Sequence, residues 1–101
     1  MIEKSKKPKV EYLEGVEEGT YCNTAYINFT PYEFIFDFGT IIPGVPELGK
    51  EAKIRIHTRI RTSPQHAKAI YDLLKRKIEE YERKTNIRLE TPKEEEKAPY
   101  G

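Results

Sequence analysis

The stretch TAYINFTPYEFIFDFG, residues 24–39, alternates apolar and polar side chains on both sides of a single turn. Alternation with a period of two is typical of strands that bury one face. The apolar side chains that would share this face are Ala25, Ile27, Phe29, Phe34, Phe36 and Phe38. Pro31 interrupts the pattern, as prolines in turns do. The stretch therefore predicts a β-hairpin.

A third alternating run, KIRIHTRIR, covers residues 53–61. Its basic members are Lys53, Arg55, His57, Arg59 and Arg61, and Ile54, Ile56 and Ile60 lie between them. This pattern predicts a third strand with one apolar and one basic face. The preceding segment, residues 41–51, contains two prolines and two glycines and is expected to be an extended loop. Its Val45 and Leu48 either cover the end of the core or contact a partner.

A helix is expected from Pro64 to Thr85. Ser63 is a favourable N-cap, and proline is well tolerated at the first helical position. Spacings of three and four predict an amphipathic helix, whose apolar positions are Ala67, Ile70, Leu74, Ile78 and Tyr81. Asn86 can adopt the left-handed conformation that ends many helices.

These elements predict an α+β fold in the order β-β-β-α. We expect an antiparallel meander of three, or with one more element four, strands, with one long amphipathic helix packed on one sheet face. Residues 1–20 are predicted to be a flexible charged arm, residues 21–89 the single domain, and residues 90–101 a disordered charged tail. A domain of roughly 70 residues has only a small core of its own, which favours oligomerisation.

Composition points to a cytoplasmic protein without a membrane segment. The 101 residues carry a net charge of +1 and include a single cysteine, Cys22, which has no partner for an internal disulfide. No apolar run approaches the roughly 20 residues that a bilayer requires, and the charged N-terminus is not expected to be a secretory signal, because no apolar stretch follows its charges. Abundant Lys, Arg and Glu are typical of thermophilic proteins.

Several short motifs occur together along the chain. They are Asn28-Phe29, Pro31-Tyr32-Glu33-Phe34, Asp37-Phe38-Gly39, Ser63-Pro64-Gln65-His66-Ala67-Lys68 and Tyr81-Glu82. This set resembles a family of small prokaryotic domains of unknown function. The resemblance implies an intact domain and no particular activity. The layout of strands followed by a helix is also similar, in topology alone, to SecB-type export chaperones.

The basic strand and the loop are the candidate binding surfaces. The residues concerned are Tyr26, Ile35, Arg55, His57, Arg59, Arg61, Val45 and Leu48. Glu33 and Asp37 are expected on the same face, where they could pair with the basic side chains across strands. Our main hypothesis is a non-enzymatic module that binds itself, as a dimer or larger assembly, and a protein partner.

The alternative hypothesis is binding of RNA or single-stranded DNA. Tyr26 would stack on a base while Arg55 and Arg59 hold the backbone, helped by the Lys4–Lys9 arm. The nearly neutral chain argues against this alternative, because nucleic-acid domains usually carry a positive excess.

Gln65 and His66 lie in the first turn of the expected helix. They either satisfy free N–H groups there or form an anion site at the helix N-terminus. Cys22, His57 and His66 match no zinc spacing, so neither a metal nor another cofactor is expected. No arrangement of residues suggests a catalytic centre, and we expect no enzyme activity.

Overall fold

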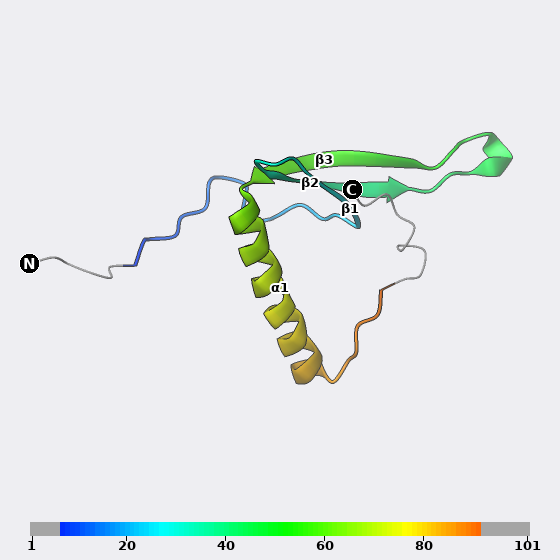
Figure 1. Ribbon diagram of the computed structural model, residues 1–101. Coiled ribbons are helices and arrows are strands. Elements are labelled where there is room, and N and C mark those ends of the chain that lie inside the picture. The colour runs from blue at the N-terminus through cyan, green and yellow to red at the C-terminus, as the bar shows by residue number, and fades with distance from the viewer. Residues whose placement is uncertain (1–6, 92–101) are drawn as a thin grey trace, which may run out of the picture.

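The computed structural model describes residues 7–91, which form a three-stranded antiparallel sheet and one long helix (Figure 1). The strands are β1 (Thr24–Phe29), β2 (Phe34–Ile42) and β3 (Lys53–Thr62), and they lie in the order β1-β2-β3. The helix α1 spans Pro64–Thr85. The predicted α+β class and the β-β-β-α order are confirmed.

The first hairpin has the register that its alternation predicts. Ile27 lies opposite Phe36, and Phe29 lies opposite Phe34. The Thr30 hydroxyl accepts hydrogen bonds from the backbone N–H groups of Tyr32 and Glu33, at 3.1 and 3.2 Å, and so organises the turn. The three phenylalanines of β2 consequently share one surface, which we call the phenylalanine face. The opposite surface, which carries Asp37, we call the Asp37 face.

The second hairpin is longer than expected. Ile41 and Ile42 continue β2 instead of starting a loop. The connection contains a short 3₁₀ helix, η1 (Pro46–Leu48), which ends at Gly49 with φ of 70°. The β2–β3 hairpin extends beyond β1, so its tip lies far from α1 (Figure 1). The loop therefore does not cover the end of the core, and that interpretation was wrong.

A β-bulge interrupts the pairing of β2 with β3. Phe38 lies opposite Thr58, but the next residue, Gly39, lies opposite Ile56. His57 is the extra residue, and beyond it the two faces of β3 are exchanged. A Cβ on Gly39 would meet the Arg55 carbonyl group and lie 3.0 Å from the Ile56 Cδ1 atom. Only glycine fits this close approach.

The helix begins and ends where the sequence predicts. The Ser63 hydroxyl accepts a hydrogen bond from the His66 N–H at 3.1 Å. At the other end Asn86 has φ of 61°, and its N–H donates to the Glu82 carbonyl oxygen. Both ends of α1 are thus capped by the chemistry visible in the sequence.

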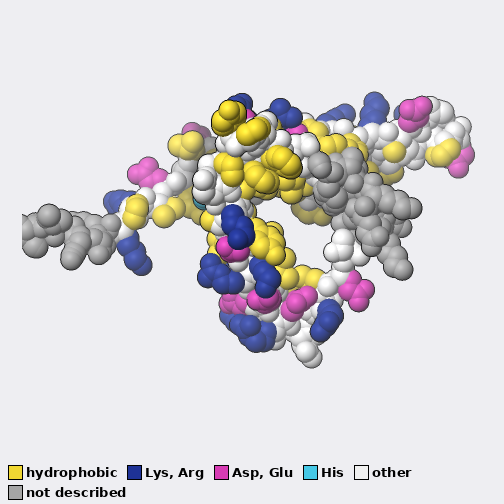
Figure 2. All heavy atoms as spheres, viewed as in Figure 1, with side chains coloured by type: hydrophobic (Ala, Val, Ile, Leu, Met, Phe, Trp, Pro, Cys, Tyr) yellow, Lys and Arg dark blue, Asp and Glu magenta, His cyan; other side chains and the backbone are white. Residues whose placement is uncertain are grey.

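Only the beginning of α1 contacts the sheet. The helix then runs away from the strands (Figure 1), and apolar side chains line the inner side of the angle between the two (Figure 2). Among residues 7–91 the only buried apolar side chain is Ala67, which is 8% exposed. The expected core, in which the whole helix covers the sheet face, is therefore not formed within the part of the chain that the structure describes.

Residues 7–23, ahead of β1, form no strand or helix, and two backbone hydrogen bonds shape the turns between Leu13 and Gly19. The predicted C-terminal tail lies almost wholly outside the described residues. In the part of the chain that the structure covers, no helix is both long and apolar enough to cross a membrane.

Candidate functional site

The predicted row of five basic side chains does not share one face. Arg59 and Arg61 lie on the Asp37 face, where they are opposite Asp37 and Ile35. Arg55 and Lys53 are opposite Thr40 and Ile42, which belong to the phenylalanine face. The bulge at His57 causes this exchange, because one extra residue reverses every side chain beyond it. The expected continuous basic face was wrong.

The bulge reverses the isoleucines in the same way. Ile54 and Ile56 lie opposite Ile41 and Gly39, on the Asp37 face instead of the expected phenylalanine face. They are 43% and 41% exposed, and Ile41 is 45% exposed. The Asp37 face therefore carries an apolar strip toward the hairpin tip and charges toward the helix end.

The charges on the Asp37 face are paired. Arg59 donates from Nε and Nη2 to the two carboxylate oxygens of Asp37, at 2.6 and 2.8 Å. These hydrogen bonds, aided by the charge of Arg59, hold the pKa of Asp37 below its usual value against the opposing effect of burial. Arg61 Nε donates to Glu33 at 3.2 Å. The expected cross-strand ion pairs are formed, and they neutralise two of the five members of the predicted basic row.

Tyr26 and Ile35 are half-buried beside these pairs. Tyr26 lies opposite Asp37, which places it on the same face as Arg59 and on the opposite face from Arg55. The structure thus brings Tyr26, Ile35, Arg59 and Arg61 together and separates them from Arg55 and His57.

The remaining basic side chains lie on the phenylalanine face. Lys53 and Arg55 border a hollow of about 520 Å³ together with Lys50 and Glu51 near the hairpin tip. Neither Lys53 nor Arg55 has an ion-pair partner among the described residues. His57 Nδ1 lies 2.8 Å from the Thr58 hydroxyl. These two residues and Phe38 line a second hollow, of about 490 Å³, against residues 15–22.

The other predicted site residues lie apart from both groups. Val45 and Leu48 are 38% and 68% exposed at the hairpin tip. Gln65 and His66 are exposed in the first turn of α1, where Ser63 satisfies the His66 N–H. Within residues 7–91 no group of acidic, histidine and cysteine side chains could hold a metal ion.

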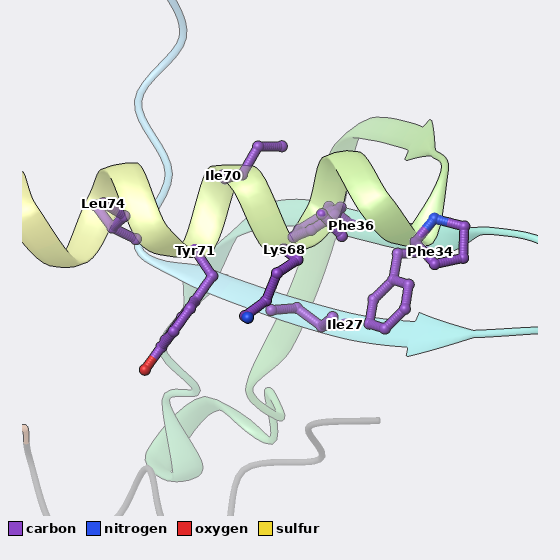
Figure 3. A pocket seen from close by; sticks show the side chains of 9 residues that line it. Ile27, Phe34, Phe36, Lys68, Ile70, Tyr71 and Leu74 are labelled. Atoms are coloured by element: carbon purple, nitrogen blue, oxygen red, sulfur yellow. The ribbon is translucent and has the colours of Figure 1, made fainter.

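The most apolar hollow is a groove between the start of α1 and strands β1 and β2. It measures about 350 Å³ and is lined by Ile27, Phe34, Phe36, Pro64, Ala67, Lys68, Ile70, Tyr71 and Leu74. Tyr71 and Lys68 extend from the helix toward the strand that carries Ile27 (Figure 3). A shallower hollow continues along the helix past Tyr71 and Leu74 to Ile78.

The side chains at the predicted apolar positions of α1 beyond Ala67 form an exposed row, which we call the helix stripe. This surface was missed as a functional one, because the sequence analysis placed its residues in the core. Ile70, Leu74, Ile78 and Tyr81 are 36%, 56%, 39% and 45% exposed. Gly39 was also missed. Its signal was a lone glycine within a strand pattern, which often marks a bulge or a close backbone approach.

Fold and surfaces together define a small α+β domain with an open apolar groove and, on the Asp37 face, charges that are paired with one another. The chain belongs to the family described as "Protein of unknown function (DUF3467)", whose model matches residues 1–89. The expected membership of a domain-of-unknown-function family is thereby confirmed. No curated protein and no solved structure matches the chain.

Proposed function

We propose that this protein is a non-enzymatic binding module that acts as a homo-oligomer. Other copies cover the groove and the helix stripe, and the Asp37 face with the hairpin tip remains for a protein partner. The observation that supports this proposal is that Ala67 alone, among the apolar side chains of residues 7–91, is buried in a single copy.

The exposed helix stripe supplies the energetic reason for association. Burying a large apolar side chain completely contributes about 1.5–3 kcal/mol, and this is the main term that offsets the entropy of folding. In one copy Leu74 and Tyr81 realise only about half of this contribution, because they are 56% and 45% exposed. A second copy would supply the missing contacts, so folding and association are expected to be coupled.

The Asp37 face suits a different contact. Its charges already neutralise one another through Arg59–Asp37 and Arg61–Glu33. Covering a paired charge costs less than covering a free one. The exposed Ile54 and Ile56 beside these pairs provide an apolar contact of the kind found at the centre of protein interfaces.

Sedimentation equilibrium over a wide range of concentrations tests the proposal. We expect an oligomer, and a thermal midpoint that rises with protein concentration. A matched pair of variants separates the two faces. Ile78→Asp should dissociate the oligomer, whereas Ile56→Asp should keep it, although these isoleucines are almost equally exposed, at 39% and 41%. A monomeric wild-type chain at every concentration would refute the proposal.

The nucleic-acid alternative has one observation in its favour, which is the group formed by Lys50, Lys53 and Arg55 around one hollow. Tyr26 lies on the opposite face of the sheet from Arg55. One nucleic-acid strand would therefore not place a base on Tyr26 and a phosphate at Arg55 together. Lys4 lies outside the described residues. Titration with labelled RNA and single-stranded DNA at two salt concentrations tests this alternative, since phosphate contacts give salt-dependent affinity. An absence of binding at low salt would remove it.

A further inference from the structure

The spacing of the apolar side chains along α1 is symmetric about Leu74. Ala67, Ile70, Leu74, Ile78 and Tyr81 are separated by three, four, four and three residues. At 3.6 residues per turn, all five point within about 40° of the direction of Leu74. The stripe is therefore narrow, straight and centred on Leu74, which is also the most exposed aliphatic side chain in it, at 56%.

From this symmetry we propose that α1 binds α1 of a second copy in antiparallel orientation, with a two-fold axis beside Leu74. This arrangement names the partner for the proposed homo-oligomer and rests on that proposal. The axis places Leu74 level with the partner's Leu74 and Ile70 level with the partner's Ile78. The small Ala67 lies level with the partner's large Tyr81. Such a contact is isologous and closes as a dimer.

The groove gives the partner's Tyr81 a place to bind. Ala67 lines the groove together with Ile27, Phe34 and Phe36. Because alanine has a short side chain, the groove remains open at the level where the antiparallel axis places Tyr81 of the second copy. A tyrosine suits this position, since its ring is apolar and its hydroxyl group can remain in water.

The exposed area is sufficient for a specific dimer. Taking about 100 Å² for an aliphatic and 200 Å² for an aromatic side chain, the exposed parts of the helix stripe with Tyr71 and Ile27 amount to roughly 400 Å² of apolar area per copy. Homodimer interfaces are about 65% apolar, so the total interface would be near 1,200 Å². This value reaches the lower limit of stable interfaces and exceeds most crystal contacts.

Charge also favours the antiparallel orientation. Lys68 and Glu82 lie on the same flank of the stripe near opposite ends, and no described residue forms an ion pair with Lys68. An antiparallel pair brings Lys68 of each copy near the partner's Glu82, whereas a parallel pair would place these flanks on opposite sides of the interface and leave Lys68 without this partner. On the same flank near the axis, Lys75 is paired with Glu79 of its own copy at 3.0 Å.

Thiol cross-linking of the full chain, with Cys22 replaced by serine, tests the arrangement. Leu74→Cys should cross-link to itself in high yield. Ile70→Cys and Ile78→Cys should each cross-link poorly to themselves, since in the antiparallel pair the two copies of either position lie about 12 Å apart along the helix. A mixture of these two chains, distinguished by a mass tag, should give mixed cross-links. Arg76→Cys, on the back of the helix, is the matched control: its exposed thiol should be alkylated but should not form a cross-link. The reagent is a bismaleimide too short to span the separation of about 12 Å between the two copies of Ile70→Cys or of Ile78→Cys.

Three results would overturn the inference. Equal self-cross-linking of Ile70→Cys, Leu74→Cys and Ile78→Cys in a dimer would indicate a parallel pair. A dimer that cross-links at none of these positions would indicate another interface. Both results would leave the proposed homo-oligomer intact. A chain that sediments as a monomer would refute the homo-oligomer and the helix pair together.

Discussion

Truncation of Leu74 is the sharpest test of the helix stripe. Leu74 is 56% exposed in one copy, and complete burial of a leucine contributes about 1.5–3 kcal/mol. Association would therefore gain about 0.8–1.7 kcal/mol from each Leu74 and twice this amount from both copies. Leu74→Ala should weaken the dimer by this sum, which raises the dissociation constant about 20- to 300-fold.

The neighbouring Leu73 offers a matched control. It has the same side chain, is 49% exposed and lies about 100° around the helix from the stripe. Leu73→Ala makes the same change in helix propensity and in side-chain volume, but should alter the dissociation constant by no more than about threefold. Sedimentation equilibrium measures both variants. Equal losses from the two substitutions, or no loss from Leu74→Ala, would refute the assignment of the stripe to the interface.

Three further predictions concern the sheet and the helix end. Gly39→Ala should destabilise the fold by about 1–3 kcal/mol in urea unfolding, because its Cβ would collide with the Arg55 carbonyl group; an unchanged unfolding midpoint would contradict the close packing at the bulge. Asp37→Asn should remove a pH dependence: the pKa of Asp37 is lowered in the folded state, so its contribution to stability is complete above the ordinary carboxylate pKa and is lost as pH falls through the folded value. Urea midpoints measured from neutral to acidic pH should decline less in this variant than in the wild type, and parallel curves would refute the role of the Arg59 pair. Ser63→Ala should cost about 1 kcal/mol through loss of the N-cap, while Ser63→Asp should retain most of the stability; no loss in thermal unfolding of Ser63→Ala would show that the cap is dispensable.

The sheet and the helix differ in how they depend on other copies. The hairpins are held by backbone pairing and by the Arg59–Asp37 bridge within one chain. Beyond its second turn the helix is held, among residues 7–91, by its own backbone, the Asn86 cap, the hydrogen bond from Leu89 to Glu82 and surface ion pairs such as Lys75–Glu79. Substitutions in the stripe are thus expected to change assembly, and substitutions at Gly39 or Asp37 to change the sheet.

Local patterns in the sequence determined the elements. Period-two alternation identified the strands around Ile27, Phe36 and Arg59. Ser63, Pro64 and Asn86 marked both ends of α1. These features were predictable because capping, turn formation and alternation depend on residues only a few positions apart.

Two features needed the tertiary structure. The strict alternation of residues 53–61 suggested one continuous basic face, yet the pairing of Gly39 with Ile56 inserts His57 as a bulge and divides that face. Register depends on the partner strand, so the alternation of one strand does not encode it. The amphipathic stripe around Leu74 likewise indicated that an apolar cover is needed. Periodicity does not tell whether the cover belongs to the same chain or to another, and only the path of α1 away from the sheet decided that residues 7–91 of a single copy leave the stripe open.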